Sequence, residues 1–373
     1  MDVVGASNRA GPATAVDLFT QVRELWDESE RPLPMSPERI GDYELVFKLA
    51  SGGMADVFLA RSKATPGLNQ VVALKRIHRH LVGEPGYREM FLDEARIAFQ
   101  ISHRNVCPVF DFGESYGEHY LAMEYLVGEP MARLLNRLAQ EPDRWPPSFT
   151  APRLAHMIAG ACAGLHAAHN VEDARGNSLE VVHRDVTPRN LFLTYGGATK
   201  VLDFGIATAR MKSHAKRDGD LRGNLAYMAP EQLTGGPIDR RADIWALGVT
   251  FWEMLAMNRL FRRSDQKTTA SAVLYDDIPS PAKYLPSTME ELGPIVLKAM
   301  RRDPDERWQT AHEMGLAIRR VLHAQPEVIG PADLSEWMND AFPFGEARKR
   351  QLIRIARVGS SGGGAGKLGT GEK

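Results

Sequence analysis

"VVHRDVTPRNLFL", residues 181–193, places Asp185 and Asn190 on a loop between a helical segment and strand-like residues. A second stretch, "KVLDFGIA" (residues 200–207), brings Asp203 to the end of a short apolar strand. Hard divalent cations such as Mg²⁺ prefer carboxylate, amide and phosphate oxygens as ligands. Asn190 and Asp203 supply such ligands, which leaves Asp185 to meet the hydroxyl group of a substrate.

A glycine turn between two strands lies further towards the N-terminus. In "LASGGMADVFLA" (residues 49–60) the backbone N–H groups of the turn can close over phosphates, although such turns are common in hairpins of every kind. Lys75 follows inside the alternating apolar run "VVALKRI", where a buried ammonium group requires a partner. Glu94 lies on the apolar stripe of the helical run 87–101 and is the expected partner, the alternative being that Glu94 lies at the edge of that stripe.

The elements divide into two groups along the chain. Helices dominate after Pro130, whereas the earlier part is rich in strands, with the helical run 87–101 among them. The predicted strands are 43–50, 55–62, 70–77, 107–115 and 118–126. We therefore predict an α+β fold with a small β-rich lobe and a larger α-helical lobe, joined at about residues 124–128.

Residues 43–322 resemble the eukaryotic-type protein kinase domain, in the form found in bacterial serine/threonine kinases. The resemblance implies an ATP- and Mg²⁺-dependent transfer of the γ-phosphoryl group to protein hydroxyls. It implies that Lys75 pairs with the α- and β-phosphates and with Glu94, that Asp185 is the catalytic base, and that Asn190 and Asp203 hold Mg²⁺.

The resemblance also implies a nucleotide site between the lobes. "MEYL" (residues 123–126) is similar to the hinge, so that Met123 borders the adenine and the backbone of Glu124 and Leu126 meets its edge. Ala73 and Phe192 would lie on the two faces of the adenine ring. The loop residues expected to contact the nucleotide are Leu49, Ala50, Ser51, Gly52, Gly53, Met54 and Val57.

Three further stretches favour a protein substrate over a small metabolite. "MAPEQL" (residues 228–233) resembles the end of a kinase activation segment, and "RRADIWALG" (residues 240–248) resembles the buried helix that anchors it, with Asp243 at its start. "RDPDERW" (residues 302–308) supplies Arg307, which we expect to pair with Glu231.

Several positions depart from the family pattern. Ala50 and Ala55 replace two glycines of the loop, which should make it stiffer. Thr187 stands where most serine/threonine kinases carry a lysine, and Arg189 is interpreted as a substitute cation. Asn224 replaces a threonine that usually contacts the catalytic aspartate, so that Thr187 and Asn224 could bridge to Asp185. The alternative is a decayed pseudokinase that binds nucleotide and partners as a scaffold.

Regulation is expected in the activation segment. Arg184, next to the aspartate, suggests control by phosphorylation, and Ser213 is the better candidate phosphosite. Asp218 and Asp220 could instead mimic a phosphate and keep the segment ordered.

Composition and flanking segments complete the prediction. Net charge of −1 argues against nucleic acid as a partner, two cysteines indicate a reduced compartment, and no membrane span or signal peptide is predicted, so a cytoplasmic location is expected. Residues 1–40 are predicted to form an arm with one helix (14–28) and a "RPLPMSP" breaker. Residues 323–358 are predicted to form a helical extension, whose basic stretch 346–358 is interpreted as a solvated helix face, and 359–373 a glycine-rich disordered tail.

The expected partners are ATP and protein substrates, and two copies of the chain could associate for autophosphorylation. A different class of function stays open, in which the protein is a docking module that captures partners through the 1–40 arm and the basic C-terminal stretch.

Overall fold

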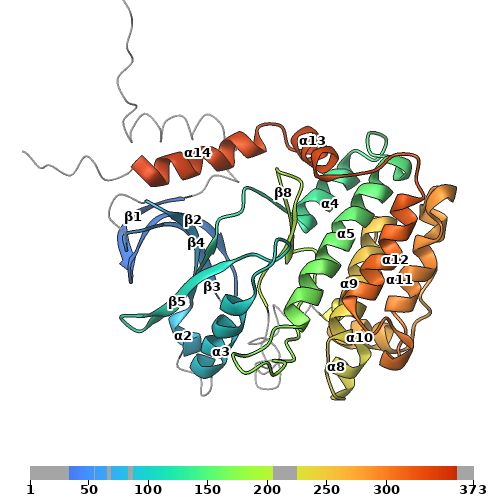
Figure 1. Ribbon diagram of the computed structural model, residues 1–373, viewed down its shortest axis with the longest axis horizontal. Coiled ribbons are helices and arrows are strands. Elements are labelled where there is room, and N and C mark those ends of the chain that lie inside the picture. Colours follow the sequence, from blue (N-terminus) through green and yellow to red (C-terminus); the bar gives the residue numbers. More distant parts are fainter. Residues whose placement is uncertain (1–32, 54, 65–68, 83–86, 205–224, 359–373) are drawn as a thin grey trace, which may run out of the picture.

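The computed structural model describes residues 33–53, 55–64, 69–82, 87–204 and 225–358, apart from the side chains of 33–37, 82, 87–90, 93 and 94. A strand-rich lobe with two helices lies beside a larger helical lobe (Figure 1). The predicted α+β fold with two unequal lobes is confirmed.

The small lobe is built on a six-stranded antiparallel sheet of order β1-β2-β3-β4-β6-β5. The elements of this lobe are β1 Leu33–Ile40, β2 Tyr43–Ser51, β3 Ala55–Ser62, β4 Val71–Ile77, α2 Arg79–Val82, α3 Tyr87–Gln100, β5 Val109–Ser115 and β6 Glu118–Glu124. One face of the sheet is closed by a cluster of buried side chains that includes Leu45, Phe58 and Leu74. Buried and half-buried residues alternate along β2, and the consecutive Phe58 and Leu59 of β3 are buried in different clusters, so both faces of the sheet are covered.

Strand β1 corrects the prediction of a breaker at 31–37. It pairs with β2 at the edge of the sheet, with an irregular register between Pro34 and Glu38. Proline lacks a backbone N–H group, but an edge strand needs hydrogen bonds on one side alone, so proline is tolerated there. Composition indicated a break because the sequence does not reveal which strand lies at an edge.

The large lobe is built around two helices, α5 and α9, which are buried along almost their whole length. Its helices are α4 Met131–Gln140, α5 Pro147–His169, α8 Pro230–Thr234, α9 Arg241–Ala256, α10 Gln266–Tyr275, α11 Leu292–Ala299, α12 Ala311–His323, α13 Pro331–Ala341 and α14 Gly345–Val358, with short 3₁₀ turns at Leu225–Tyr227, Pro281–Tyr284, Ser287–Met289 and Pro304–Glu306. A small sheet of β7 Gly128–Pro130, β8 Leu191–Thr194 and β9 Thr199–Val201 faces the other lobe.

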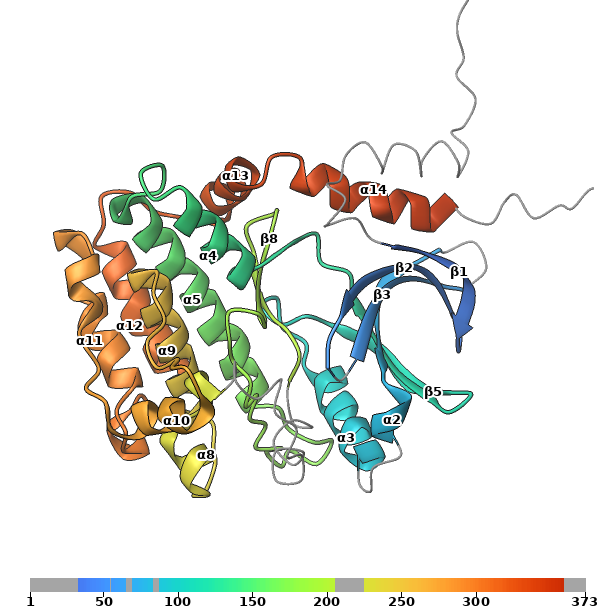
Figure 2. The same cartoon turned by 180° about the vertical axis from the view of Figure 1, so that it is seen from behind.

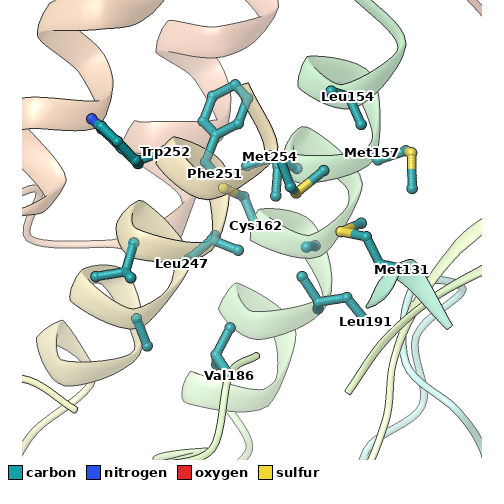
Figure 3. Packing of buried hydrophobic residues seen from close by; sticks show 14 of the residues in the cluster. Met131, Leu154, Met157, Cys162, Val186, Leu191, Leu247, Phe251, Trp252 and Met254 are labelled. Carbon is teal, nitrogen blue, oxygen red and sulfur yellow. The ribbon is translucent and has the colours of Figure 1, made fainter. Parts of the chain in front are cut away.

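The loop between α5 and β8 is anchored in this core. Val186 and Leu191, at 1% and 0% exposure, extend beside α5 into the cluster that α9 completes with Leu247 and Phe251 (Figure 3). The backbone of the loop therefore has a rigid support, while its polar side chains are left for the space between the lobes.

The C-terminal helices connect the two lobes. Helix α13 packs on the large lobe through Leu334 and Trp337, and α14 then runs along the outer side of the small-lobe sheet (Figure 2). Leu352 and Ile355 of α14, each 1% exposed, pack against Phe47 and Leu59. The interpretation of 346–358 as a solvated face is therefore wrong for its apolar side, because the sheet covers it.

Two further observations concern the described residues. Within them, no helix is long and apolar enough to cross a membrane. Cys107 and Cys162 are both free thiols and both buried, and burial raises the pKa of each to about 12. The predicted arm helix 14–28 and tail 359–373 lie outside the described residues.

Candidate active site

A buried carboxylate at the start of α9 holds the backbone of the loop that carries Asp185. Asp243, fully buried, accepts hydrogen bonds from the N–H groups of His183 and Arg184, each at 2.7 Å, and pairs with His169 Nε2 at 2.8 Å. Burial favours the neutral acid, but the hydrogen bond and charge of His169 and the His183 N–H outweigh it, so the pKa of Asp243 is lowered. Asp243 is thus an ionised anchor for the loop.

The loop is also fixed from its other side. His183 Nε2 lies 2.7 Å from the carbonyl oxygen of Leu202, and its ring lies 4.7 Å from the ring of Phe204. Arg184 and Asp203 both have positive φ, at 66° and 47°, a conformation that non-glycine residues seldom adopt. Such backbone strain persists where the surroundings impose it and is concentrated at functional sites.

Asp185 and Asn190 lie together in the folded loop. The Nδ2 group of Asn190 donates to Asp185 Oδ2 and to the Asp185 carbonyl oxygen, each at 2.8 Å. The N–H group of Leu202 donates to the carbonyl oxygen of Asn190 at 2.8 Å, so Asn190 lies next to the segment that carries Asp203. The three polar residues from two stretches of sequence therefore meet at one place.

Lys75 reaches this place from the small lobe. Its Nζ lies 3.3 Å from Asp203 Oδ1, which joins β4 to the large lobe across the gap between the lobes. The side chain of Glu94 lies outside the described residues, so the expected pair of Lys75 and Glu94 stays a prediction. An ammonium group beside the Asp203 carboxylate is a suitable neighbour for phosphate oxygens and a divalent cation.

An apolar cluster lies beside these polar groups. It joins Ala73, Met123 and Leu126, each 8–9% exposed, with the less buried Val57 and Phe192. These are five of the residues expected to contact the nucleotide. The same cluster includes Cys107, Val109, Tyr125 and Leu202, which the sequence motifs did not single out.

The turn between β2 and β3 is tightly closed. The N–H of Gly52 donates to the carbonyl oxygen of Ala55 at 2.9 Å, and Ser51 Oγ donates to Asp56 Oδ1 at 2.5 Å. Asp56 also pairs with Lys48 at 2.9 Å. Burial opposes its ionisation, but the hydrogen bonds from Ser51, Lys48 and His78 outweigh burial and lower the pKa of Asp56 to about 2.

One expected loop residue packs elsewhere, and the position of a second stays a prediction. Leu49 packs in the cluster of Phe47 and α14 rather than in the cluster of Ala73, and Met54 lies outside the described residues. Asp56 was not singled out because its role depends partly on His78, which follows β4 and is not revealed by the sequence around Asp56.

The positions that depart from the family pattern can be placed in part. Thr187 is buried, and its Oγ1 accepts a hydrogen bond from the N–H of Arg189 at 3.3 Å, while the side chain of Arg189 is exposed. Both residues line a small cavity of about 50 Å³ with Tyr227 and Arg259. Asn224, Ser213, Asp218 and Asp220 lie outside the described residues.

The expected ion pair beyond the activation segment is confirmed. Arg307, whose side chain is 0% exposed, donates to both carboxylate oxygens of Glu231 at 2.7 Å. Its remaining donors reach the carbonyl oxygens of Arg301, Arg302 and Arg241. A guanidinium with this many partners fixes α8 against the start of α9 and the segment that follows α11.

A second buried carboxylate of α9, Glu253, lies at the end of the activation segment. Glu253 accepts hydrogen bonds from the hydroxyl of Tyr227 at 2.8 Å and from Arg259 at 2.7 Å. Burial and the Glu253 charge raise the pKa of Tyr227. Tyr227 is therefore a structural hydroxyl that holds the end of the activation segment.

From the glycine turn to Arg307, the residues that make these contacts occur along the chain in the order expected for a protein kinase. The protein kinase domain matches residues 43–316. The chain belongs to the protein kinase family. Its curated relatives include bacterial kinases. The chain is 40% identical over 315 residues to tyrosine-protein kinase MasK of Myxococcus xanthus, and the aligned region covers 84% of this chain and 48% of MasK.

Serine/threonine-protein kinases of other bacteria are also similar to this kinase chain. It is 31% identical over 310 residues to PknB of Mycolicibacterium smegmatis (80% of the chain, 46% of the relative) and 29% identical over 284 residues to PrkC of Bacillus subtilis (76% and 41%). The chain thus spans less than half the length of these curated relatives. The fold is that of the PknI kinase domain of Mycobacterium tuberculosis, with a TM-score of 0.58, 24% identity, and coverage of 77% of this chain and 99% of that one.

Proposed function

We propose that this kinase chain catalyses phosphoryl transfer from ATP, with Mg²⁺, to serine or threonine hydroxyls of proteins. The observation that carries the proposal is the meeting of Asp185, Asn190, Asp203 and Lys75 at one place, from two lobes and three stretches of sequence. Structural roles alone give no reason for these polar groups to converge beside an apolar cluster.

The residues present are suitable for Mg·ATP. The cluster of Ala73, Met123, Leu126 and Phe192 offers an apolar slot for adenine, and Lys75 offers a cation for the phosphates. Asn190 and Asp203 would hold the metal ion, which when bound neutralises the charge of the phosphates. Leu49, Ala50, Ser51, Gly52, Gly53, Met54 and Val57 are proposed to cover the nucleotide.

Asp185 is proposed as the residue that accepts the proton of the substrate hydroxyl. Its carboxylate is oriented by Asn190, and its backbone is fixed through Asp243 and His183. Phosphoryl transfer depends mainly on positioning and charge stabilisation, so a rigid loop is the relevant contribution. Glu94 is proposed to orient Lys75 from α3.

Arg189 is proposed to supply the positive charge that the family usually takes from a lysine at position 187. The side chain of Arg189 is exposed on the same loop as Asp185. The hydroxyl of Thr187 stabilises the turn by accepting a hydrogen bond from the N–H group of Arg189. The alternative, a pseudokinase that binds nucleotide without transfer, is less consistent with the complete set of Lys75, Asp185, Asn190 and Asp203.

The relatives differ in the acceptor residue that their names state. PrkC and PknB are named serine/threonine-protein kinases, whereas MasK, at 40% identity, is named a tyrosine-protein kinase. Tyrosine is therefore the second candidate acceptor.

The remaining proposals concern the domain bounds, self-association and cellular location of the chain. We place the kinase domain at 43–322 and the helical extension at 323–358, with self-association as a route to autophosphorylation. A cytoplasmic location is proposed, because the two cysteines of the chain are free thiols and its proposed substrate is ATP.

The test is phosphotransfer from labelled ATP by the purified chain, with modified residues located by mass spectrometry. Asp185→Asn should abolish transfer, and Arg189→Gln should lower kcat by about tenfold or more, as expected for loss of one charge that stabilises the transition state. Exposed Arg354, on α14, gives the matched control Arg354→Gln. Nucleotide binding without transfer in the wild type, restored by Thr187→Lys, would show a pseudokinase.

A further inference from the structure

A polar cavity lies where the C-terminal helices cross the large lobe. It has a volume of about 490 Å³ and is lined by residues of β7 and α4 on one side and by Ala341–Pro343, Gly345, Arg348 and Lys349 on the other. The cavity is separate from the apolar cluster of Ala73 and Phe192. The cavity has two walls: β7 and α4 form one, and the connection between α13 and α14 with the start of α14 forms the other.

The lining of this cavity is rich in positive charge. It includes the four cations Arg133, Arg137, Arg348 and Lys349, and one carboxylate, Glu129. The amides of Asn136 and Gln140 add polar groups. Cations gathered around one space repel each other, and the positive end of α14, which begins at Gly345 in the cavity wall, adds to the same potential.

The carboxylates nearby balance this charge in part. Glu129, 3% exposed, accepts from Arg133 at 3.0 Å and from the hydroxyl of Tyr195 at 3.2 Å, and lies 3.5 Å from Lys349. Arg137 pairs with Glu141, which lies outside the lining, at 2.6 Å. Counting Glu129 and Glu141, two carboxylates among the described residues stand against the four cations of the lining, which leaves a positive surplus among these residues.

We propose that this cavity binds a small soluble anion that bears phosphate groups. Arginine guanidinium groups suit phosphate oxygens because they donate paired hydrogen bonds, and lysine adds a point charge. The volume admits a diphosphate with part of an organic group. The site is distinct from the ATP site proposed above and does not depend on the proposed function.

Binding would also hold α14 in place. Arg133 and Arg137 belong to α4, whereas Arg348 and Lys349 belong to α14, so one anion contacts both sides of the junction. Because α14 continues onto the sheet of the small lobe, the anion links a site on the large lobe to the position of the small lobe. The occupied cavity therefore favours the docked helix by mass action.

The experiment is calorimetric titration of the full chain with inorganic pyrophosphate, at fixed ionic strength and with divalent metal chelated. We expect saturable binding that weakens by about tenfold or more in Arg133→Gln and in Lys349→Gln, as for loss of one charge-assisted hydrogen bond. Arg350→Gln is the matched control, since Arg350 neighbours Lys349, is 60% exposed and pairs with Glu346. Thermal unfolding without ligand checks that each variant is folded.

Hydrogen exchange gives a second readout. Pyrophosphate should slow exchange of the amides of α14 in the wild type and in Arg350→Gln but not in Lys349→Gln. Absence of binding by the wild type, or binding that the two cavity variants leave unchanged, would overturn the proposal. Binding to vesicles containing phosphatidylglycerol without binding to pyrophosphate would likewise overturn it, in favour of a membrane surface.

Discussion

Truncation of Leu352 tests whether α14 is an integral part of the small lobe. Leu352 is 1% exposed and lies in a cluster with Phe47, Leu59 and Ile355. Replacing a fully buried leucine by alanine removes apolar contact and leaves a cavity, at a typical cost of about 2–5 kcal/mol. We expect Leu352→Ala to cost about 3 kcal/mol.

This cost should appear as undocking of the helix before the lobes unfold. The burial of Leu352 and Ile355 stabilises the docked state by about 1.5–3 kcal/mol each. A loss of about 3 kcal/mol would raise the undocked population by about a hundredfold. Amides of α14 that exchange through undocking should therefore exchange about a hundredfold faster.

Hydrogen exchange followed by mass spectrometry of peptides covering 345–358 measures this effect. The matched control is Arg354→Ala, because Arg354 belongs to the same helix and is exposed. It should change exchange by no more than a few fold. Equal exchange in Leu352→Ala and Arg354→Ala would refute the docked helix. Since Leu49 packs in the same cluster, Leu352→Ala should also raise the KM for ATP.

Three other changes test single contacts. Arg307→Lys cannot keep both bonds to Glu231, and should lower the free energy of unfolding by about 3 kcal/mol in urea denaturation, whereas an unchanged midpoint would contradict a stabilising pair. Asp243→Asn removes the charge that holds the backbone of the loop carrying Asp185, and should lower kcat by about tenfold or more with little change in KM, and equal losses in both would argue against a positioning role. The Asp56 carboxylate, with its pKa near 2 against an ordinary 3.8, stabilises the fold above about pH 4 and loses that contribution as pH falls to about 2, so the stability difference between wild type and Asp56→Asn should vanish over that range in denaturation curves.

Local pattern was sufficient for much of the fold. Strand 55–62 was predicted with the bounds that β3 has, and the helical run 87–101 corresponds to α3 within one residue. Alternation and helical spacing express burial directly, because each period repeats the direction that side chains face. The pairing of Glu231 with Arg307, 76 residues apart, was expected from the resemblance to protein kinases and not from local pattern.

Long-range contacts were harder to predict. Strand β1 contains prolines that read as a break, and its pairing depends on lying at a sheet edge. Asp56 appears in the sequence as an ordinary turn residue, yet its low pKa results from the hydrogen bond of Ser51 in the same turn and from two further neighbours, Lys48 on β2 and His78 on the connection after β4. Neither neighbour follows from the spacing of residues around Asp56.

The chemistry proposed for this chain could be predicted from its sequence, because Asp185, Asn190, Asp203 and Lys75 occur in short stretches whose local structure presents them. What the tertiary structure alone decided is where the C-terminal segment goes. The sequence 346–358 shows an amphipathic basic helix, which is equally compatible with solvent, a partner or a membrane. Docking on Phe47 and Leu59 is settled by shape and by the α13 anchor, since a hydrophobic face specifies that it must be covered but not by which surface.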